Sequence, residues 1–262
     1  MDWSQFDPDS AIRQRYLNID EITEDVQDTI ELGGWDLKEF VDVYDISWVY
    51  HENGLEGVVL TYPEIRSAVD NKIVSDVSLL PRYRDIKAQK QCVDLMRQKA
   101  LQPKSNITIK FLKQLHGILL HQGEMSGQYR KDIPIHRTYF HEIAHPSQIE
   151  TRLKEVLDYL NAPVERDTHQ VEFAANVHHR FMRVFPFSKF SGIIGRSLLN
   201  YVLDRMNYFP AVIHATDRQR YYEALRGEES GLREFLCDTI ENGLDNTLKF
   251  FCQQKTSTER QA

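Results

Sequence analysis

The sequence predicts a mainly α-helical protein, and two local patterns carry this prediction. Apolar residues recur with helical spacing in several stretches. In the clearest of them the apolar side chains that share one helix face are Ile149, Leu153, Val156, Leu157 and Leu160. Ser147 and Glu150 stand before and at the start of that run with the Ser-x-x-Glu spacing of a capping box, so we expect a helix to begin near Gln148.

The chain is expected to form one domain with an elaboration at one end and a tail at the other. Residues 1–46 are charged and weakly periodic, and we expect a helical elaboration there, made of short helices broken near Gly33 and Gly34. The main domain is expected over residues 47–252. The polar residues 253–262 are expected to form a flexible tail.

Within the main domain, helical patterns are predicted over residues 87–99, 107–120 and 232–251. Two further amphipathic helices flank a loop from Phe185 to Ser191. His178 falls on the apolar face of the first of them, so we expect a core histidine whose ring nitrogens are satisfied. Residues 131–140 differ, because aromatic and aliphatic residues there surround Pro134, and a short β-hairpin is predicted.

Composition and charge limit the classes of partner. The 262 residues include 32 basic and 39 acidic side chains, and the net charge of −7 argues against nucleic acid as a partner. The three cysteines are far apart and suit a reducing cytosol. No signal-peptide core and no bilayer-length apolar run is present, so we expect no membrane partner and a cytoplasmic location, with export by a route without a cleavable signal left open. The sequence does not give the oligomeric state.

One motif matches zinc chemistry. Residues 141–145 spell His-Glu-Ile-Ala-His, the pattern in which two histidines one helical turn apart bind zinc and the glutamate activates a water. That chemistry needs a helix, but Pro146 disfavours helical backbone at His145, and the predicted helix starts after the motif. We therefore expect no metal site, and zinc hydrolysis is the third and weakest hypothesis.

The loop after Phe185 has features of an anion site. Ser191 is predicted to cap the following helix, whose first amide groups, including that of Gly192, would point into the loop with the positive end of the helix dipole. Lys189 and Arg196 would add positive charge. The plain alternative is an ordinary helix connection, since short loops with Gly and Pro are common.

The loop sequence Phe-Pro-Phe-Ser-Lys-Phe-Ser-Gly-Ile-Ile-Gly-Arg, residues 185–196, resembles the signature of the Fic family, His-Pro-Phe-x-(Asp/Glu)-Gly-Asn-Gly-Arg-x-x-Arg. The residues shared with it are Pro186, Phe187, Gly192 and Arg196. Flanking segments resemble the family's leading helix, its target-docking flap and its closing helices, so the resemblance runs from about Ser47 to Phe250. It implies a Fic/Fido-type helical bundle with a short β-hairpin flap, and a protein target docked at residues 131–146.

The departures from the signature bear on activity. In the family the motif histidine is the general base for transfer of AMP from a nucleotide to a target hydroxyl; here Phe185 stands in its place and cannot accept a proton. Lys189 replaces the acidic residue that would hold magnesium, so any nucleotide or other phosphorylated ligand is expected to bind without it. The catalytic residue is therefore unknown, with Ser188 and His179 as weak candidates.

A regulatory element of the family is also recognisable. The run Asn-Gly-Leu-Glu-Gly at residues 53–57 resembles the inhibitory segment, whose glutamate pairs with the second motif arginine. The resemblance implies a contact between Glu56 and Arg196, and the sequence leaves open whether that pair is regulatory or structural. Glu52 departs from this pattern, because the family has Ser or Thr four residues before the glutamate.

Two hypotheses about function stay open on the sequence. One is a phosphate- or nucleotide-anchored transferase of altered chemistry, held by Lys189, Ser191, Gly192 and Arg196. The other is a catalytically inactive Fic-fold module for binding or regulation. Both exclude AMP transfer by the histidine mechanism.

Overall fold

The computed structural model describes residues 8–33, 35, 37–69, 80–102, 105–134, 141–165 and 167–259. The helices of this part of the chain are α1 Pro8–Gly33, α2 Leu37–Leu55, α3 Tyr62–Val69, α4 Leu80–Ala100, α5 Ile109–Leu119, α6 Ile149–Asn161, α7 Gln170–Val184, α8 Ser191–Arg205, α9 Arg218–Arg226 and α10 Glu229–Glu259. Two 3-10 turns, η4 Pro146–Gln148 and η5 Ala215–Asp217, precede α6 and α9. The described residues contain no strand, so the mainly helical prediction is confirmed in its class.

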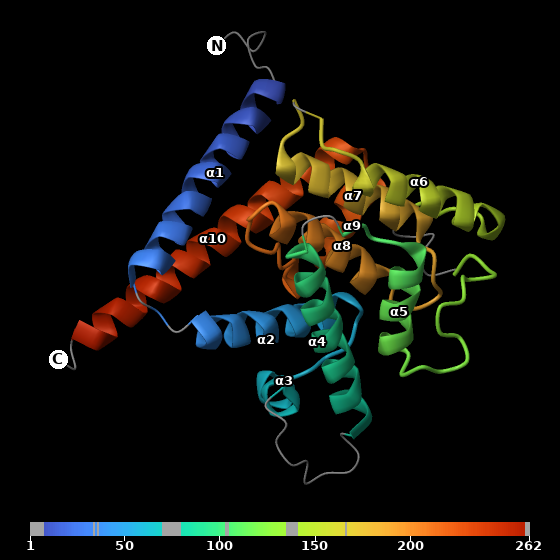
Figure 1. The fold of residues 1–262 in the computed structure, drawn as a ribbon, viewed down its shortest axis with the longest axis horizontal. Helices are drawn as coiled ribbons and strands as arrows, with labels where there is room; N and C mark the ends of the chain where they lie inside the picture. The colour runs from blue at the N-terminus through green and yellow to red at the C-terminus, as the bar shows by residue number, and fades with distance from the viewer. Residues whose placement is uncertain are drawn as a thin grey trace.

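Helix α8 lies at the centre, packed against α7, α4 and α5, and all its residues from Ser191 to Leu203 are buried (Figure 1). One large core joins it to the buried faces of α1, α6, α7, α9 and α10, while a smaller cluster lies between α2, α3 and α4. Burial on all sides explains why α8 lacks a polar face. The loop before α8 is therefore anchored to the most buried helix of the molecule.

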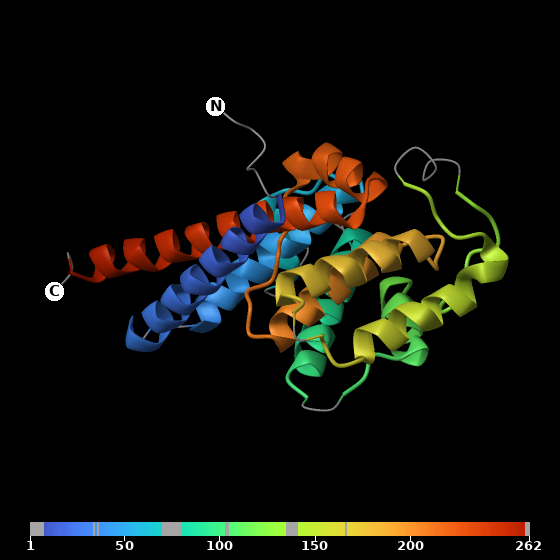
Figure 2. The ribbon, with the colours of Figure 1, turned by 90° about the horizontal axis from the view of Figure 1, so that it is seen from above.

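The N-terminal region is helical with a break after Gly33, as predicted, but the helix before the break is long rather than short. Helix α1 runs unbroken to Gly33, where the predicted break lies, and packs along α10, and the two project together from the rest of the molecule (Figures 1 and 2). Arg15 joins them through Asp238, 2.5 Å away, and Glu241, 2.6 Å away. The boundary expected between residues 46 and 47 lies inside α2, and α10 continues through the expected tail to Glu259.

The predicted β-hairpin over residues 131–140 is not seen among the described residues, and residues 135–140 lie outside them. Backbone hydrogen bonds hold the chain on both sides of the segment. Ala144 N–H donates to Arg183 O over 2.8 Å and Arg130 N–H donates to Pro186 O over 3.0 Å. Residues 130 and 144 are thus tied to the loop after α7 and to the end of α7.

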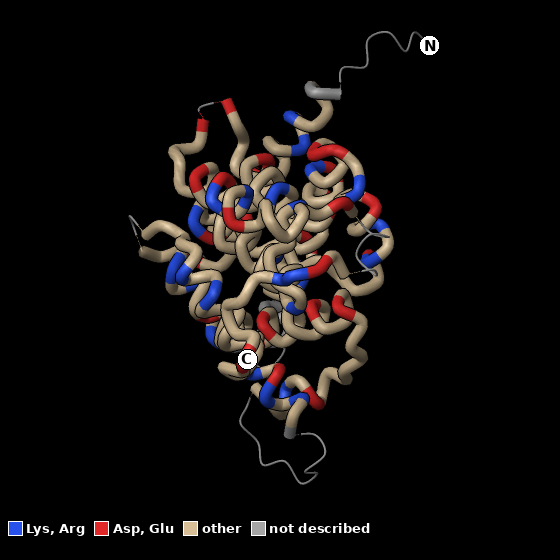
Figure 3. Tube along the Cα trace, turned by 90° about the vertical axis from the view of Figure 1, so that its right-hand side faces the viewer, with Lys and Arg blue, Asp and Glu red and all other residues tan. Residues whose placement is uncertain are grey.

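Charged residues of both signs are interspersed along the chain, without a continuous basic stripe in the view of Figure 3. In the part of the chain that is described, no helix is both long and apolar enough to cross a membrane.

Candidate functional site

The loop between α7 and α8 is bracketed by two phenylalanines with left-handed backbone. Phe185, which follows the last residue of α7, has φ 45°, and Phe190, which precedes α8, has φ 62°. Helices commonly end in this conformation, but usually with glycine, because a side chain makes it strained. Tertiary contacts must therefore offset the backbone strain at these two residues.

At Phe185, burial of the side chain in the core offsets the strain. Its side chain is 1% exposed and its ring meets the ring of His141 edge-on, with centroids 6.0 Å apart. Phe187 is also buried and stacks on His116 at 4.0 Å. The position at which the signature has its base is thus filled by a hydrocarbon ring turned inward, with no lone pair to accept a proton.

Arg130 ties the loop to the end of α7. Its Nε donates to Phe185 O over 2.7 Å, and its Nη2 donates to Val184 O over 3.2 Å and to Ala144 O. The guanidinium is buried and satisfies carbonyls that the helix end leaves without partners. The sequence placed Arg130 beside the flap but gave it no role.

Ser191 does not cap α8, contrary to the sequence prediction. It is the first residue of the helix, and its Oγ accepts from Phe187 N over 2.8 Å and donates to Phe187 O over 2.9 Å. The left-handed Phe190 takes the cap position, which moves the hydroxyl inward. Ser191 is buried and its hydroxyl bonds to the backbone of the loop, whereas Ser188 and Lys189 are exposed.

Arg196 is the chemical centre of the site. It is 1% exposed, and its Nε donates to Glu52 Oε2 over 2.8 Å. Its Nη2 lies 2.6 Å from Glu52 Oε2 and 2.9 Å from Glu56 Oε1. The structure therefore brings Glu56 and Arg196 together, as the resemblance implied, and adds a second carboxylate that the sequence analysis treated only as a departure.

The electrostatics follow from burial. Burial would lower the pKa of Arg196, but Glu52, Tyr221 and Glu56 hold it well above its ordinary value. Burial raises the pKa of Glu52, and Arg196 opposes that shift. Trp48 Nε1 donates to Glu52 Oε1 over 3.3 Å and helps to fix the carboxylate.

Glu56 lies directly against the first turn of α8. A Cβ added to Gly192 would meet Glu56 Oε1 at 2.5 Å and Arg196 Nη1 at 2.9 Å. The place predicted for an anion thus holds the protein's own carboxylate. Arg196 Nη1 has no hydrogen-bond partner among the described residues.

The end of α2, which carries Glu52 and is followed directly by Glu56, is fastened to η5 and α9. His51 stacks on His214 at 4.2 Å, and its Nδ1 accepts from Ala215 N over 3.2 Å. Burial and His214 lower the pKa of His51 to about 4, so its ring is neutral and able to accept near pH 7. Arg218 Nε donates to Leu55 O over 2.9 Å and closes the last turn of α2.

The two histidines of α7 lie away from the loop. His178 Nδ1 donates to Gly195 O over 2.9 Å, and its Nε2 accepts from Tyr221 OH over 2.8 Å; burial lowers its pKa to about 3. It is the satisfied core histidine that the sequence predicted. His179 Nε2 donates to Gly227 O over 3.2 Å, toward the connection between α9 and α10, so this candidate faces away from the loop.

The zinc-like motif is not helical, as predicted. His141 is buried and its Nε2 donates to Met182 O over 2.9 Å, whereas the exposed His145 caps η4 by accepting from Ser147 N. Ser147 Oγ bonds to His145 and does not cap α6, so the predicted capping box is wrong although α6 begins one residue after the expected start. Among the residues placed by the structure, no three His, Cys, Asp or Glu side chains converge as a metal site.

A magnesium ion does not fit the residues of the loop. Lys189 brings an ammonium group, which cannot coordinate a cation, and the nearby carboxylates of Glu52 and Glu56 are engaged by Arg196. Ile193, which stands where the signature has its first arginine, is buried in the core. Arg196 is thus the motif arginine left at the site.

Comparison with known proteins gives one family model and several relatives. Residues 106–203, from just before α5 to the end of α8, match the model of the Fic/DOC family. A protein adenylyltransferase Fic of Drosophila willistoni is 27% identical over 205 residues, which cover 75% of this chain and 40% of that protein. The corresponding protein of Nematostella vectensis is 25% identical over 211 residues, covering 79% and 49%. The chain therefore spans less than half the length of these relatives.

Solved structures extend the similarity to the whole fold. A Fic-domain signalling protein of Bacteroides thetaiotaomicron superimposes with a TM-score of 0.78 and 22% identity, over 91% of this chain and 98% of that one. Fic-1 of C. elegans, residues 134–508, gives a TM-score of 0.76 at 17% identity, over 95% and 74%. At these identities the likeness establishes the fold.

Proposed function

We propose, from the premise that residues 106–203 of this chain are a Fic domain, that the domain works as a binding or regulatory module and does not transfer AMP. The observation that carries the proposal is the buried ring of Phe185 at the position of the motif base. Two more observations support it, the engagement of Arg196 by carboxylates and the ammonium group of Lys189 in place of a metal ligand. The relatives are named as adenylyltransferases, an activity that the proposal does not extend to this chain.

We propose that the module binds a protein partner. The resemblance implies a docking place at residues 131–146, of which Ile133 is 39% exposed. A partner there would rest beside Arg130 and the end of α7, the elements that hold the loop. The proposed location is cytoplasmic, in line with buried thiols at Cys92 and Cys237.

The test measures AMP transfer directly. Purified protein is incubated with α-labelled ATP and magnesium or manganese, alone and with a cell lysate, and incorporated label is counted. We expect label no higher than that of a heat-denatured sample for the wild type and for Phe185→His. The single variant restores a base but leaves Lys189 and the occupied Arg196 in place. Clear self-modification by either protein would contradict the proposal.

A second function is favoured by one observation. Arg196 Nη1 is buried beside the first turn of α8 and has no hydrogen-bond partner among the described residues. A buried donor of this kind can bind an oxygen atom of a ligand. This arrangement supports a phosphate-anchored transferase that is closed at rest, with Lys189 supplying the charge of the missing metal. A thermal-shift screen with nucleotides and phosphorylated metabolites separates the two functions, since a ligand at about 100 times its dissociation constant adds about 2.7 kcal/mol.

A further inference from the structure

Glu52 lies in the last turn of α2 and Glu56 follows the helix directly, and both side chains reach Arg196 of α8. Glu52 makes the closer contacts, 2.8 Å to Nε and 2.6 Å to Nη2, and its side chain is 8% exposed against 16% for Glu56. It is also the one fixed by Trp48. By distance and burial, the residue that departs from the inhibitory pattern is the stronger partner of the arginine.

The net charge of Arg196, Glu52 and Glu56 depends on how many of the two carboxylates are ionised. One guanidinium and two carboxylates give a net charge of −1 at the first turn of α8, which repels a further anion. Neutralising one carboxylate leaves a net charge of zero and one ion pair intact. Only when both are neutral does the site carry +1, the charge that attracts an anion to the guanidinium of Arg196.

We infer that Glu52 is a second intramolecular ligand of Arg196, so that the anion site at α8 opens only when both Glu52 and Glu56 leave it. This inference rests on the proposed function, one support of which is the engagement of Arg196 by the two carboxylates. The ligand that takes their place is a multivalent phosphate or a phosphorylated group of similar charge. Release of Glu56 alone leaves the arginine held.

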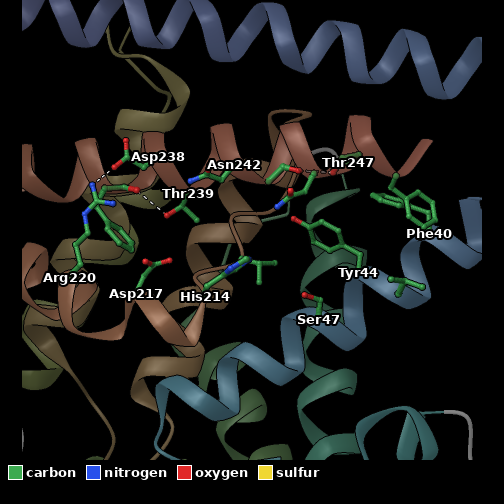
Figure 4. Close-up of a pocket in the computed structure, with 16 residues that line it drawn as sticks. Phe40, Tyr44, Ser47, His214, Asp217, Arg220, Asp238, Thr239, Asn242 and Thr247 are labelled. Carbon is green, nitrogen blue, oxygen red and sulfur yellow. Dashed lines mark hydrogen bonds and ion pairs between the residues drawn. The ribbon is translucent and has the colours of Figure 1, made fainter. Parts of the chain in front are cut away.

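The packing of α2 is consistent with such a release. Between α2 and α10 lies a cavity of about 450 Å³, lined by Phe40 and Tyr44 on one side and by Thr239 and Asn242 on the other (Figure 4). A second cavity, of about 280 Å³, also borders Phe40 and Tyr44, and extends to Arg97, Asp204 and Tyr208. Open volume therefore lies beside Phe40 and Tyr44 in the first half of α2, although Asp45 in the same half is held by Arg97.

The experiment compares four proteins: wild type, Glu52→Gln, Glu56→Gln and the double variant. Inorganic pyrophosphate is titrated by calorimetry in magnesium-free buffer. Glu172→Gln is the matched control, because Glu172 pairs with Arg233 over 2.6 Å outside the site. We expect the double variant to bind at least about tenfold more tightly than either single variant, the wild type or the control.

Two results would overturn the inference. If Glu56→Gln alone binds pyrophosphate as tightly as the double variant, Glu52 does not keep the anion site closed. If the folded double variant binds no better than wild type, there is no latent anion site. AMP transfer by the double variant would instead overturn the proposed absence of catalysis. It would leave intact the inference that both glutamates hold Arg196, so the two failures are distinguishable.

A second measurement uses only folded single variants. Exchange of the Arg196 Nε–H with solvent is followed by ¹⁵N NMR, since this group donates to Glu52 and not to Glu56. We expect slow exchange in the wild type and in Glu56→Gln, and exchange at least about tenfold faster in Glu52→Gln. The opposite pattern, with protection lost in Glu56→Gln and kept in Glu52→Gln, would contradict the assignment.

Discussion

Phe185 and Phe190 show how single residues shape the loop. A non-glycine residue with left-handed backbone costs about 1–3 kcal/mol when its surroundings must hold it there. Burying a phenyl ring returns about 1.5–3 kcal/mol, and the ring of Phe185 is 1% exposed. The side chain that removes the base is therefore also the one that stabilises the loop conformation.

Arg130 gives the first prediction at this scale. Arg130→Ala should lower the free energy of unfolding by about 3 kcal/mol or more, because several buried carbonyls lose a charged donor together. Arg130→Lys should recover only part of this, since an ammonium group cannot reach carbonyls on both sides of the fork. Urea unfolding measures both.

Arg220→Ala is the matched control for that experiment, because Arg220 is exposed, forms an ion pair with Asp238 and lies over the ring of Phe235 at 5.4 Å. It should cost less than about 1 kcal/mol. Equal losses for Arg130→Ala and Arg220→Ala would mean that Arg130 does not hold the loop.

How much of the site could be predicted depended on the type of contact. The pair of Glu56 and Arg196 followed from the resemblance. The role of Glu52 could also have been found, since two glutamates four residues apart share a helix face. The cap at Ser191 could not, because the capping rule assumes an extended residue at the cap, and Phe190 is left-handed there.

At the scale of elements, α7 and α8 approach closely at one glycine. A Cβ on Gly195 would lie 2.8 Å from Met182 Sδ and 2.9 Å from Phe181 Cδ1, and both of those residues are fully buried in α7. Neither side chain has free space to move into, because the core around them is continuous. The approach of the two helices, and with it the position of the loop, depends on this residue.

Gly195→Ala should therefore destabilise the protein by about 1–3 kcal/mol through overpacking. The control is Gly243→Ala in α10, where an added Cβ meets nothing within 4 Å. There alanine should stabilise by about 0.5–1 kcal/mol through its higher helix propensity. Thermal unfolding should give melting temperatures that move in opposite directions, and a loss in both would show that the contact at Gly195 is not the cause.

The helices were the most predictable elements, for a physical reason. Where one face is buried and the other solvated, periodicity marks the helix, as in α6. Helix α4 begins at Leu80, seven residues before the predicted start at residue 87, because its first turns are charged and carry little periodic signal. The hairpin prediction stays open over residues 135–140, which lie outside the described residues, whereas the flanking hydrogen bonds of Arg130 and Ala144 to the end of α7 and the loop after it are long-range contacts that leave no local pattern.

For the whole molecule, α2 links the N-terminal region to the centre. Its Asp45 is fully buried and forms a bidentate pair with Arg97 of α4, at 2.7 and 3.1 Å, while Lys90 lies 3.1 Å away. Near this cluster, burial raises the pKa of Asp204 of α8 to about 7, with Arg97 opposing the shift and Asp45 adding to it. The junction of α2, α4 and α8 thus holds a carboxyl group that titrates near neutral pH.

The pH dependence of stability should reveal this group. A carboxyl whose pKa is raised in the folded state binds its proton more tightly there than in the unfolded chain. Its contribution to stability is complete below its ordinary pKa of 3.8 and is lost as the pH rises to about 7. Asp204→Asn, which mimics the protonated form, should match the wild type near pH 4 and exceed its stability at pH 8 by about 1–3 kcal/mol, below the full linkage value because the side chain is partly exposed.

Comparing the two proteins at each pH removes the other titrating groups from that measurement. His51 and His116, whose pKa values burial lowers to about 4, make stability rise with pH between about 4 and 6.5, but they do so equally in both proteins. The difference in unfolding free energy should therefore follow the titration of Asp204, with its midpoint between pH 4 and 7. A difference that stays constant over this range would mean that Asp204 keeps an ordinary pKa, and that the junction beneath α2 tolerates a charge.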